Sequence, residues 1–109
     1  MLELRYYLAG DGESPFEKWF VDLDATAAAK ISTALVRLEQ GNLSNVKGIG
    51  DGVLEYRIAW GPGYRVYFAR DGEVLVILLT GGPKRRQQRD IDNAKSHWAD
   101  YKRRRTPTR

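Results

Sequence analysis

The sequence of 109 residues contains no cysteine and a single histidine, His97. Without cysteine there is no disulfide framework and no thiolate, and one histidine rules out a His-rich zinc site and disfavours a Ser-His-Asp triad. The longest aliphatic run, Val74 to Leu79, is far too short to cross a bilayer. The start, MLELRYYL, has no basic segment followed by an apolar signal core. We therefore expect a cytoplasmic protein with no membrane segment, no metal site and no small-molecule cofactor.

The net charge of +4 is unevenly distributed along the chain. Residues 81–109 hold ten lysines and arginines against three aspartates, which gives +7 and leaves −3 for residues 1–80. A basic end on an acidic-leaning body is typical of proteins with a polyanionic partner such as nucleic acid. A solvated helix with a ragged basic tail gives the same pattern, so the charge alone leaves both interpretations open.

Capping signals predict two helices in the first half of the chain. Ser14 is suited to the N-cap of a helix with Pro15 at its first position, and Asp24 is suited to cap a second helix. Gly41 ends that second helix, and the glycine-rich residues 42–52 read as irregular. Two helices joined by so short a link predict an antiparallel helical hairpin.

Segments with a period of two predict strands at residues 2–8, 53–60, 64–70 and 73–80, and a last helix follows at 84–103. The expected fold is therefore α+β, in the order β-α-α-β-β-β-α. It has a compact antiparallel-rich sheet, the N-terminal helical hairpin on one face and the C-terminal helix on the other. The length fits one domain, residues 1–103, followed by a basic C-terminal tail, residues 104–109.

The Asp71-Gly72 dipeptide predicts a two-residue hairpin turn in which Arg70 pairs with Glu73. In that register alternate residues of both strands build the face under the helical hairpin, namely Tyr64, Val66, Phe68, Leu75, Ile77 and Leu79. On the strand 64–70 and the strand before it, a slip of one residue would send Arg65 and Arg57 into the core, so we expect their register to be strongly specified.

Arg65 falls on the opposite face with Tyr67, and the preceding strand adds Glu55 and Arg57 to that face. Because Lys84–Arg86 begins where the third of these strands ends, we expect five cations to converge on one concavity, rimmed by Tyr67 and Glu55. Like charges gathered in this way oppose folding, which indicates a function. In the alternative interpretation, Glu55 neutralises Arg57 across the surface and Lys84–Arg86 is a solvated helix start.

The chain resembles the RelE/ParE superfamily of bacterial toxins, in particular its HigB-like addiction module killer branch, which is related to phage proteins. The matching segments are SPFEKWF, GVLEYRIAWGPGYRVYF, EVLVILLTGGPKRRQQRDI and DIDNAKSHWADYKRR, which together span nearly the whole chain. The resemblance implies the toxin of a type II toxin–antitoxin module, a metal-independent endoribonuclease that cleaves mRNA on the ribosome. Its partner would be a cognate antitoxin protein. Relatives in the ParE branch inhibit DNA gyrase instead, and a non-catalytic nucleic-acid-binding module is a third possibility.

The resemblance implies basic residues on the strand that matches residues 55–58, an arginine at the position of Arg65, and further lysines or arginines at Lys84–Arg86. Among these we expect Arg57, Arg65 and Lys84 to be the catalytic residues. Guanidinium groups suit the charge that develops on a reacting phosphate, because they grip its oxygens bidentately and stay charged. Lys84 is the expected proton-transfer group. Some nuclease relatives carry tyrosine or histidine early in the last helix, where this chain has Arg89 and Asp90.

Further residues are expected to bind RNA: Arg85, Arg86, Gln87, Tyr67 and Arg89. Gln87 would orient a base or a phosphate oxygen, and Tyr67 would stack on a splayed base, as aromatic platforms do for single strands. His97 lies further along the last helix, where we expect a structural or surface role.

Overall fold

The computed structural model describes residues 1–105 of the protein. In these residues the elements follow in the order β1 (Glu3–Tyr6), α1 (Pro15–Val21), α2 (Ala25–Glu39), β2 (Val46–Gly50), β3 (Val53–Ile58), β4 (Tyr64–Asp71), β5 (Leu75–Pro83), a 3₁₀ turn (Lys84–Arg86) and α3 (Gln87–Arg104). The sheet has the strand order β1-β5-β4-β3-β2, with β1 parallel to β5 and the other pairs antiparallel. The α+β fold predicted from the sequence is confirmed.

The two helices of the first half begin where the capping signals predicted. The hydroxyl oxygen of Ser14 accepts a hydrogen bond from the Glu17 amide at 3.0 Å, and a carboxylate oxygen of Asp24 accepts one from the Ala27 amide at 2.8 Å. Each cap satisfies an amide that a helix start would otherwise leave unpaired, which stabilises it by about 1 kcal/mol. Gly41 follows α2 with a φ of +80°, a conformation that favours glycine.

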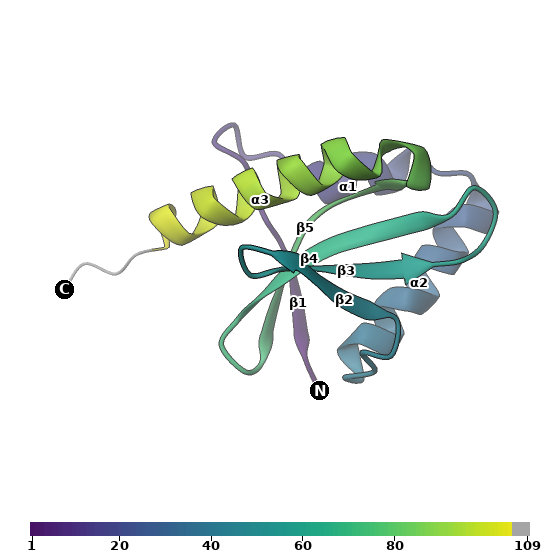
Figure 1. Ribbon diagram of the computed structural model, residues 1–109, viewed down its shortest axis with the longest axis horizontal. Helices are drawn as coiled ribbons and strands as arrows, with labels where there is room; N and C mark the ends of the chain where they lie inside the picture. The colour runs from purple at the N-terminus through teal and green to yellow at the C-terminus, as the bar shows by residue number, and fades with distance from the viewer. Residues whose placement is uncertain (106–109) are drawn as a thin grey trace.

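Two apolar cores lie on opposite faces of the sheet. Helices α1 and α2 cover one face and α3 crosses the other (Figure 1), as the sequence predicted. The core under α1 and α2 contains Phe16, Ile31, Ala34, Leu38, Tyr56, Val66, Phe68, Val76 and Leu78. The core under α3 contains Tyr7, Val53, Tyr67, Ala69, Ile77, Leu79, Ala94 and Trp98.

The predicted register of β5 against β4 was wrong. Asp71 pairs with Leu75 across a three-residue loop, rather than Arg70 with Glu73 across two residues. A register shift between Tyr67 and Phe68 then adds one residue to β5. As a result Val76 and Leu78 face α1 and α2, whereas Ile77 and Leu79 face α3, the reverse of the expectation. Residues 75–79 are apolar throughout, so their pattern could not distinguish the two faces.

The segment predicted to be irregular contains the edge strand β2. Its residues pair with β3 from Val46 opposite Tyr56 to Gly50 opposite Val53, with a bulge between Gly48 and Gly50. Glycines interrupt the apolar alternation and hide the strand. The signal that could have found it is the turn Asp51-Gly52, whose φ angles of +59° and +85° are those that Asp-Gly hairpin turns adopt.

Gly81 and Gly82 let β5 pass between two helices. A side-chain carbon on Gly81 would overlap the ring of Trp19 from α1, and one on Gly82 would overlap the carboxylate of Asp90 from α3. Strand β5 therefore continues to Pro83, three residues beyond the predicted end. Its continuation aligns Gly82 with Arg65 and places the 3₁₀ turn beside the start of β4.

The last helix also differs from its predicted limits. Lys84–Arg86 form the 3₁₀ turn, and α3 includes Arg104, which had been assigned to the tail. Arg105 forms an ion pair with Asp71 at 2.7 Å, so it too contacts the folded domain. The rest of the predicted tail, residues 106–109, lies outside the described residues. Among the helices of residues 1–105, none combines the length and the apolar character needed to cross a membrane.

Candidate functional site

The turn between β3 and β4 brings three cations together. Arg57 and Arg65 are directly opposite each other in the two strands, and the Gly63 carbonyl accepts a hydrogen bond of 2.7 Å from the Lys84 amide. Gly61 and Gly63 have φ angles of +58° and +78°, which explains why the turn needs glycine at both positions. The side chains of Arg57, Arg65 and Lys84 line one open cleft of about 490 Å³, which we call the cationic cleft.

Arg65 is buried and held by an acidic partner. Its exposed fraction is 5%, and its Nε lies 3.5 Å from Oε2 of Glu55, which is 1% exposed. The Gln87 side-chain amide donates a hydrogen bond of 2.9 Å to the same carboxylate oxygen. Glu55 therefore neutralises Arg65. The alternative interpretation of the sequence, in which Glu55 neutralises Arg57, was wrong. A guanidinium fixed in this way loses little freedom when it binds an anion.

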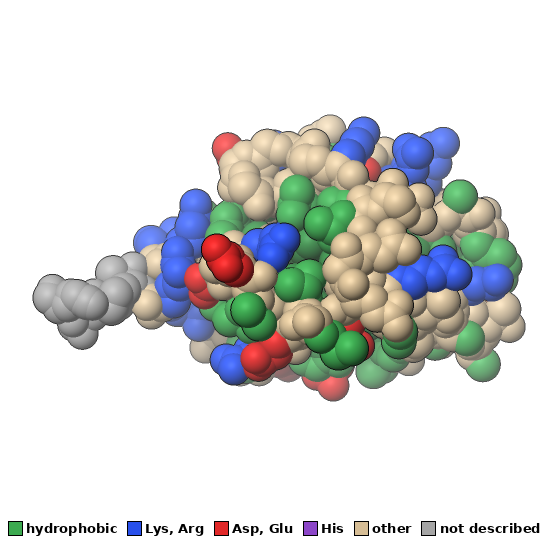
Figure 2. Space-filling model, turned by 90° about the horizontal axis from the view of Figure 1, so that it is seen from below, with side chains coloured by type: hydrophobic (Ala, Val, Ile, Leu, Met, Phe, Trp, Pro, Cys, Tyr) green, Lys and Arg blue, Asp and Glu red, His purple; other side chains and the backbone are tan. Residues whose placement is uncertain are grey.

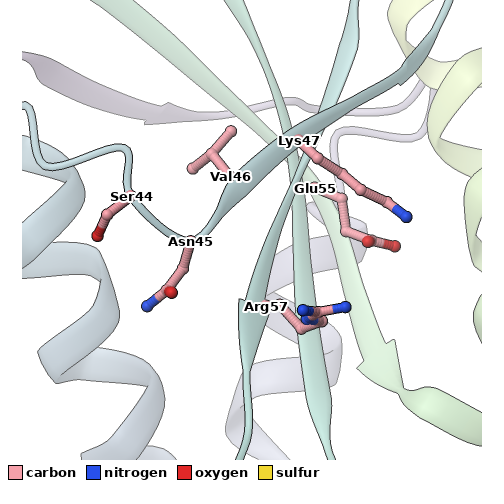
Figure 3. Close-up of a pocket in the computed structure, with 6 residues that line it drawn as sticks. All are labelled: Ser44, Asn45, Val46, Lys47, Glu55 and Arg57. Atoms are coloured by element: carbon pink, nitrogen blue, oxygen red, sulfur yellow. The ribbon is translucent and has the colours of Figure 1, made fainter.

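Arg57 has the opposite character, because its side chain is exposed. Figure 3 shows Lys47, Glu55 and Arg57 extending to the same side of the sheet. Arg57 lines the cationic cleft and two neighbouring hollows, of about 140 and 250 Å³. Within the described residues no carboxylate lies within 4.0 Å of its guanidinium. The cleft thus pairs one fixed arginine with one free to move toward a ligand.

The five predicted cations do not all converge. Lys84 lines the cationic cleft, whereas Arg85 and Arg86 line a separate hollow beside α1. The 3₁₀ turn explains the difference, because three residues per turn send successive side chains in different directions. Arg86 is also engaged by Asp90, with its Nε 3.5 Å from Oδ2. Burial raises the pKa of Asp90, although the charge of Arg86 opposes the rise.

Gln87 and Arg89 are not placed as expected. Gln87 does not line the cleft. Its hydrogen bond orients the Glu55 carboxylate, which in turn positions Arg65. Arg89 is exposed on α3 and does not line the cationic cleft. The expected stacking role of Tyr67 was wrong, because its side chain is completely buried in the core under α3. That burial also raises the pKa of the Tyr67 hydroxyl.

The aromatic residue beside the cleft is Trp60. It is half-buried, and its ring stacks on Tyr64 with a centroid distance of 6.2 Å. The ammonium group of Lys30, from α2, lies 5.7 Å from the Trp60 ring centroid. A signal that could have identified Trp60 is its position directly before the Gly61-Pro62-Gly63 turn, where strand alternation ends.

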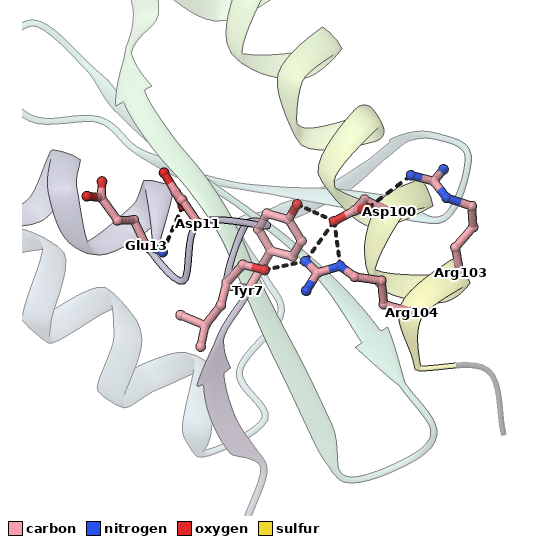
Figure 4. Close-up of polar contacts among 7 residues, drawn as sticks. Tyr7, Asp11, Glu13, Asp100, Arg103 and Arg104 are labelled. Carbon is pink, nitrogen blue, oxygen red and sulfur yellow. Dashed lines mark hydrogen bonds and ion pairs between the residues drawn. The ribbon is translucent and has the colours of Figure 1, made fainter.

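Much of the basic C-terminal region is neutralised within the fold. Asp100 forms ion pairs with Arg103 at 3.0 Å and with Arg104 at 2.7 Å (Figure 4), and Asp71 pairs with Arg105. Figure 2 shows lysine and arginine side chains around this end of the molecule, with acidic side chains beside them. The charge excess that pointed to a polyanionic partner is therefore partly matched by carboxylates of the same chain.

The contacts of Asp100 predict a specific response to acid. Hydrogen bonds from Arg104 and from the Tyr7 hydroxyl, the latter at 2.6 Å, lower the pKa of Asp100 to about 2. This interaction stabilises the fold at pH values above about 4, the pKa of an unfolded aspartate, and is lost as the pH falls towards 2. We expect the free energy of unfolding to decline over this range. In Asp100→Asn it should decline less steeply, as urea titrations across the pH range would show. Equal slopes would contradict the assignment.

His97 packs against the same region. Its ring stacks on Tyr7 with a centroid distance of 4.8 Å, and burial lowers the pKa of the imidazole. It does not line the cationic cleft.

The fold and the cleft define a class, a small α+β domain in which a strand turn presents cations at the end of a sheet. Residues 18–99 match the family described as Phage derived protein Gp49-like (DUF891). The chain belongs to this family, which is toxin-like and of the addiction-module type. An uncharacterized protein of Haemophilus influenzae is 46% identical over 81 residues, which cover 73% of this chain and 82% of the relative. The family match includes all the residues of the cationic cleft.

Proposed function

We propose that this protein is the toxin of a type II toxin–antitoxin module and that it cleaves mRNA on the ribosome without a metal ion. The observation that carries the proposal is the cationic cleft, in which Arg57, Arg65 and Lys84 come together beside one turn. Membership of a toxin-like family and the resemblance to RelE-type nucleases support the same conclusion. A cognate antitoxin would bind the toxin and block this activity.

The reaction assigned to the cleft is an internal transfer at one phosphate of the RNA. The 2′-hydroxyl gives its proton to solvent water, and its oxygen forms a bond to phosphorus as the bond to the 5′-oxygen breaks. The products are a 2′,3′-cyclic phosphate and a 5′-hydroxyl, and no water is consumed. Negative charge builds on the phosphate oxygens in the transition state, and two guanidinium groups are suited to stabilise it. Removing one such donor from an enzyme typically slows catalysis by about 10²–10³-fold.

Each cation has a distinct part in this reaction. Arg65, fixed by Glu55, offers a preorganised site for a non-bridging oxygen, and the exposed Arg57 closes on the phosphate from the neighbouring strand. Lys84 is an ammonium donor of the proton that the leaving 5′-oxygen needs. Its backbone is held to the turn through the bond to Gly63, so its side chain starts from a fixed point on the cleft wall.

Expression in cells tests this function with one variant and one matched control. Arg57→Gln removes an exposed cation from the cleft without disturbing an ion pair, so we expect a folded protein with little or no growth arrest. Arg5→Gln makes the same charge change on β1, three strands away in the sheet, and should arrest growth like the wild type. Protein synthesis, measured by pulse labelling, should stop with the wild type and recover when the neighbouring reading frame is co-expressed. A DNA-damage response with continuing translation would instead favour gyrase inhibition.

A further inference from the structure

A second hollow adjoins the cationic cleft and has a different lining. It lies between α2 and the end of β3 and has a volume of about 250 Å³. Its lining includes three cations, Lys30, Arg37 and Arg57, together with Asn45 and Trp60. Arg57, Ile58 and Ala59 line both this hollow and the cationic cleft, so the two are neighbours at this part of the chain. We call the second hollow the α2 groove.

Within residues 1–105, the cations of the α2 groove have no acidic partners. Among the described residues, no carboxylate lies within ion-pair distance of Lys30, Arg37 or Arg57, and no acidic residue lines the groove. This differs from the end of α3, where Asp100 and Asp71 neutralise the arginines. Three unneutralised cations around one groove attract a polyanion more strongly than a larger number of paired ones.

The spacing of the two cations on α2 suits a polymer. Lys30 and Arg37 are seven residues apart, which places them on the same face of the helix and about 10 Å apart along its axis. They can therefore contact different phosphates of one strand. Arg57, where the groove meets the cleft, continues the line of positive charge to the site of the proposed reaction.

Trp60 gives the groove an aromatic surface. Its ring is supported by Tyr64, while the flexible side chain of Lys30 lies over the ring, and no carboxylate in the described part of the chain pairs with it. A nucleic-acid base can take the place of the Lys30 ammonium over the indole, because every base has a flat face that stacks on tryptophan. The displaced ammonium is then free to meet the phosphate of the same nucleotide.

We propose that the α2 groove binds single-stranded RNA flanking the phosphate in the cationic cleft, with one base stacked on Trp60 and the backbone on Lys30 and Arg37. The inference rests on the proposed function for the identity of the ligand as RNA. The strand must be unpaired, since a base within a duplex cannot present its face to a side chain. Trp60 thus takes the role that the sequence had suggested for Tyr67.

Titration of the purified protein with a short 2′-O-methyl oligoadenylate tests the proposal without cleavage. We expect RNA to quench tryptophan fluorescence in the wild type. Trp60→Phe should keep most of the affinity but lose most of the quenching, and Trp60→Leu should bind about tenfold more weakly, which is typical of losing one stacked base. The Lys30→Gln/Arg37→Gln double variant should lower the slope of log affinity against log salt by about 1.4, or roughly 0.7 for each phosphate contact. Arg5→Gln is the matched control, with affinity and slope unchanged.

Two outcomes would overturn the proposal. One is affinity in both Trp60→Leu and the double variant equal to that of the wild type. The other is polyglutamate of matched charge binding as tightly as the RNA, which would assign the groove to an acidic peptide. Either result could occur while the wild type still cuts transcripts, so the proposed function would stand. Conversely, the wild-type protein could bind RNA through the α2 groove and leave transcripts intact. That result would refute the proposed nuclease activity, but the proposed RNA-binding site would stand.

Discussion

An Arg65→Lys variant is expected to fold like the wild type and to lose growth arrest. Lysine keeps a positive charge beside the Glu55 carboxylate, so the buried pair still has no net charge. It lacks the planar fork that grips two phosphate oxygens, so transition-state stabilisation should fall by about 10²–10³ in cleavage rate. Growth after induction, together with circular dichroism and the urea midpoint of the purified variant, would measure both effects.

The conservative change is needed because removing the side chain would alter two properties at once. Arg65→Ala would leave the Glu55 carboxylate buried without its partner, so loss of toxicity could reflect loss of folding. Full toxicity from a folded Arg65→Lys protein would contradict the role assigned to the guanidinium.

The second large effect that we expect is a loss of stability when Glu55, the acidic member of the buried pair, is removed. Glu55→Ala should lower the free energy of unfolding by about 3–5 kcal/mol, since it strands the Arg65 charge in a site that is 5% exposed. A small domain has only about 5–15 kcal/mol of stability, so the variant should be partly unfolded at modest urea concentrations. Urea denaturation followed by tryptophan fluorescence measures the change.

Two controls separate burial from simple loss of an ion pair. The Lys18–Glu13 pair is shorter, at 2.8 Å, but more than half of each side chain is exposed. Glu13→Ala should therefore leave the urea midpoint close to that of the wild type. The double variant Glu55→Leu/Arg65→Met, which replaces both charges by apolar groups, should recover most of the stability lost in Glu55→Ala. A cost of under 1 kcal/mol for Glu55→Ala would contradict the tight coupling of this pair.

The sequence predicted the parts of the site that depend on local signals. Arg57 and Arg65 alternate with large apolar residues on their strands, so only one register keeps both out of the core under the helices. The glycines of the turn between them identified where the chain reverses. Because these signals lie within a dozen residues of one another, the facing of the two arginines could be predicted without tertiary information, and the structure confirms it.

The errors arose where the facing of a side chain is decided by distant packing. Tyr67 and Arg65 share a face of the sheet, but α3 covers that face at Tyr67 and leaves the cleft open at the turn. The alternation of β4 contains no information about where the helix crosses. The same reason explains Gln87, whose contact with Glu55 joins residues 32 positions apart.

The cations posed a related difficulty. A count of charges by segment made the C-terminal end one of two open interpretations, a polyanion site or a solvated helix, and the structure pairs its last arginines with Asp100 and Asp71. Which cations lack partners depends on which acids fold against them, and the unpaired Arg57 lies in the part of the chain whose net charge is negative. Segment charge is therefore a poor guide to a binding surface in so small a domain.

The most direct test of the central claim is the chemistry of the RNA ends made by purified protein on ribosomes loaded with a defined mRNA. The proposed reaction predicts cuts within ribosome-bound message, each leaving a 5′-hydroxyl and a 2′,3′-cyclic phosphate, with Arg57→Gln leaving the message intact. Intact message with the wild-type protein, or cuts that leave 5′-phosphates, would contradict the account.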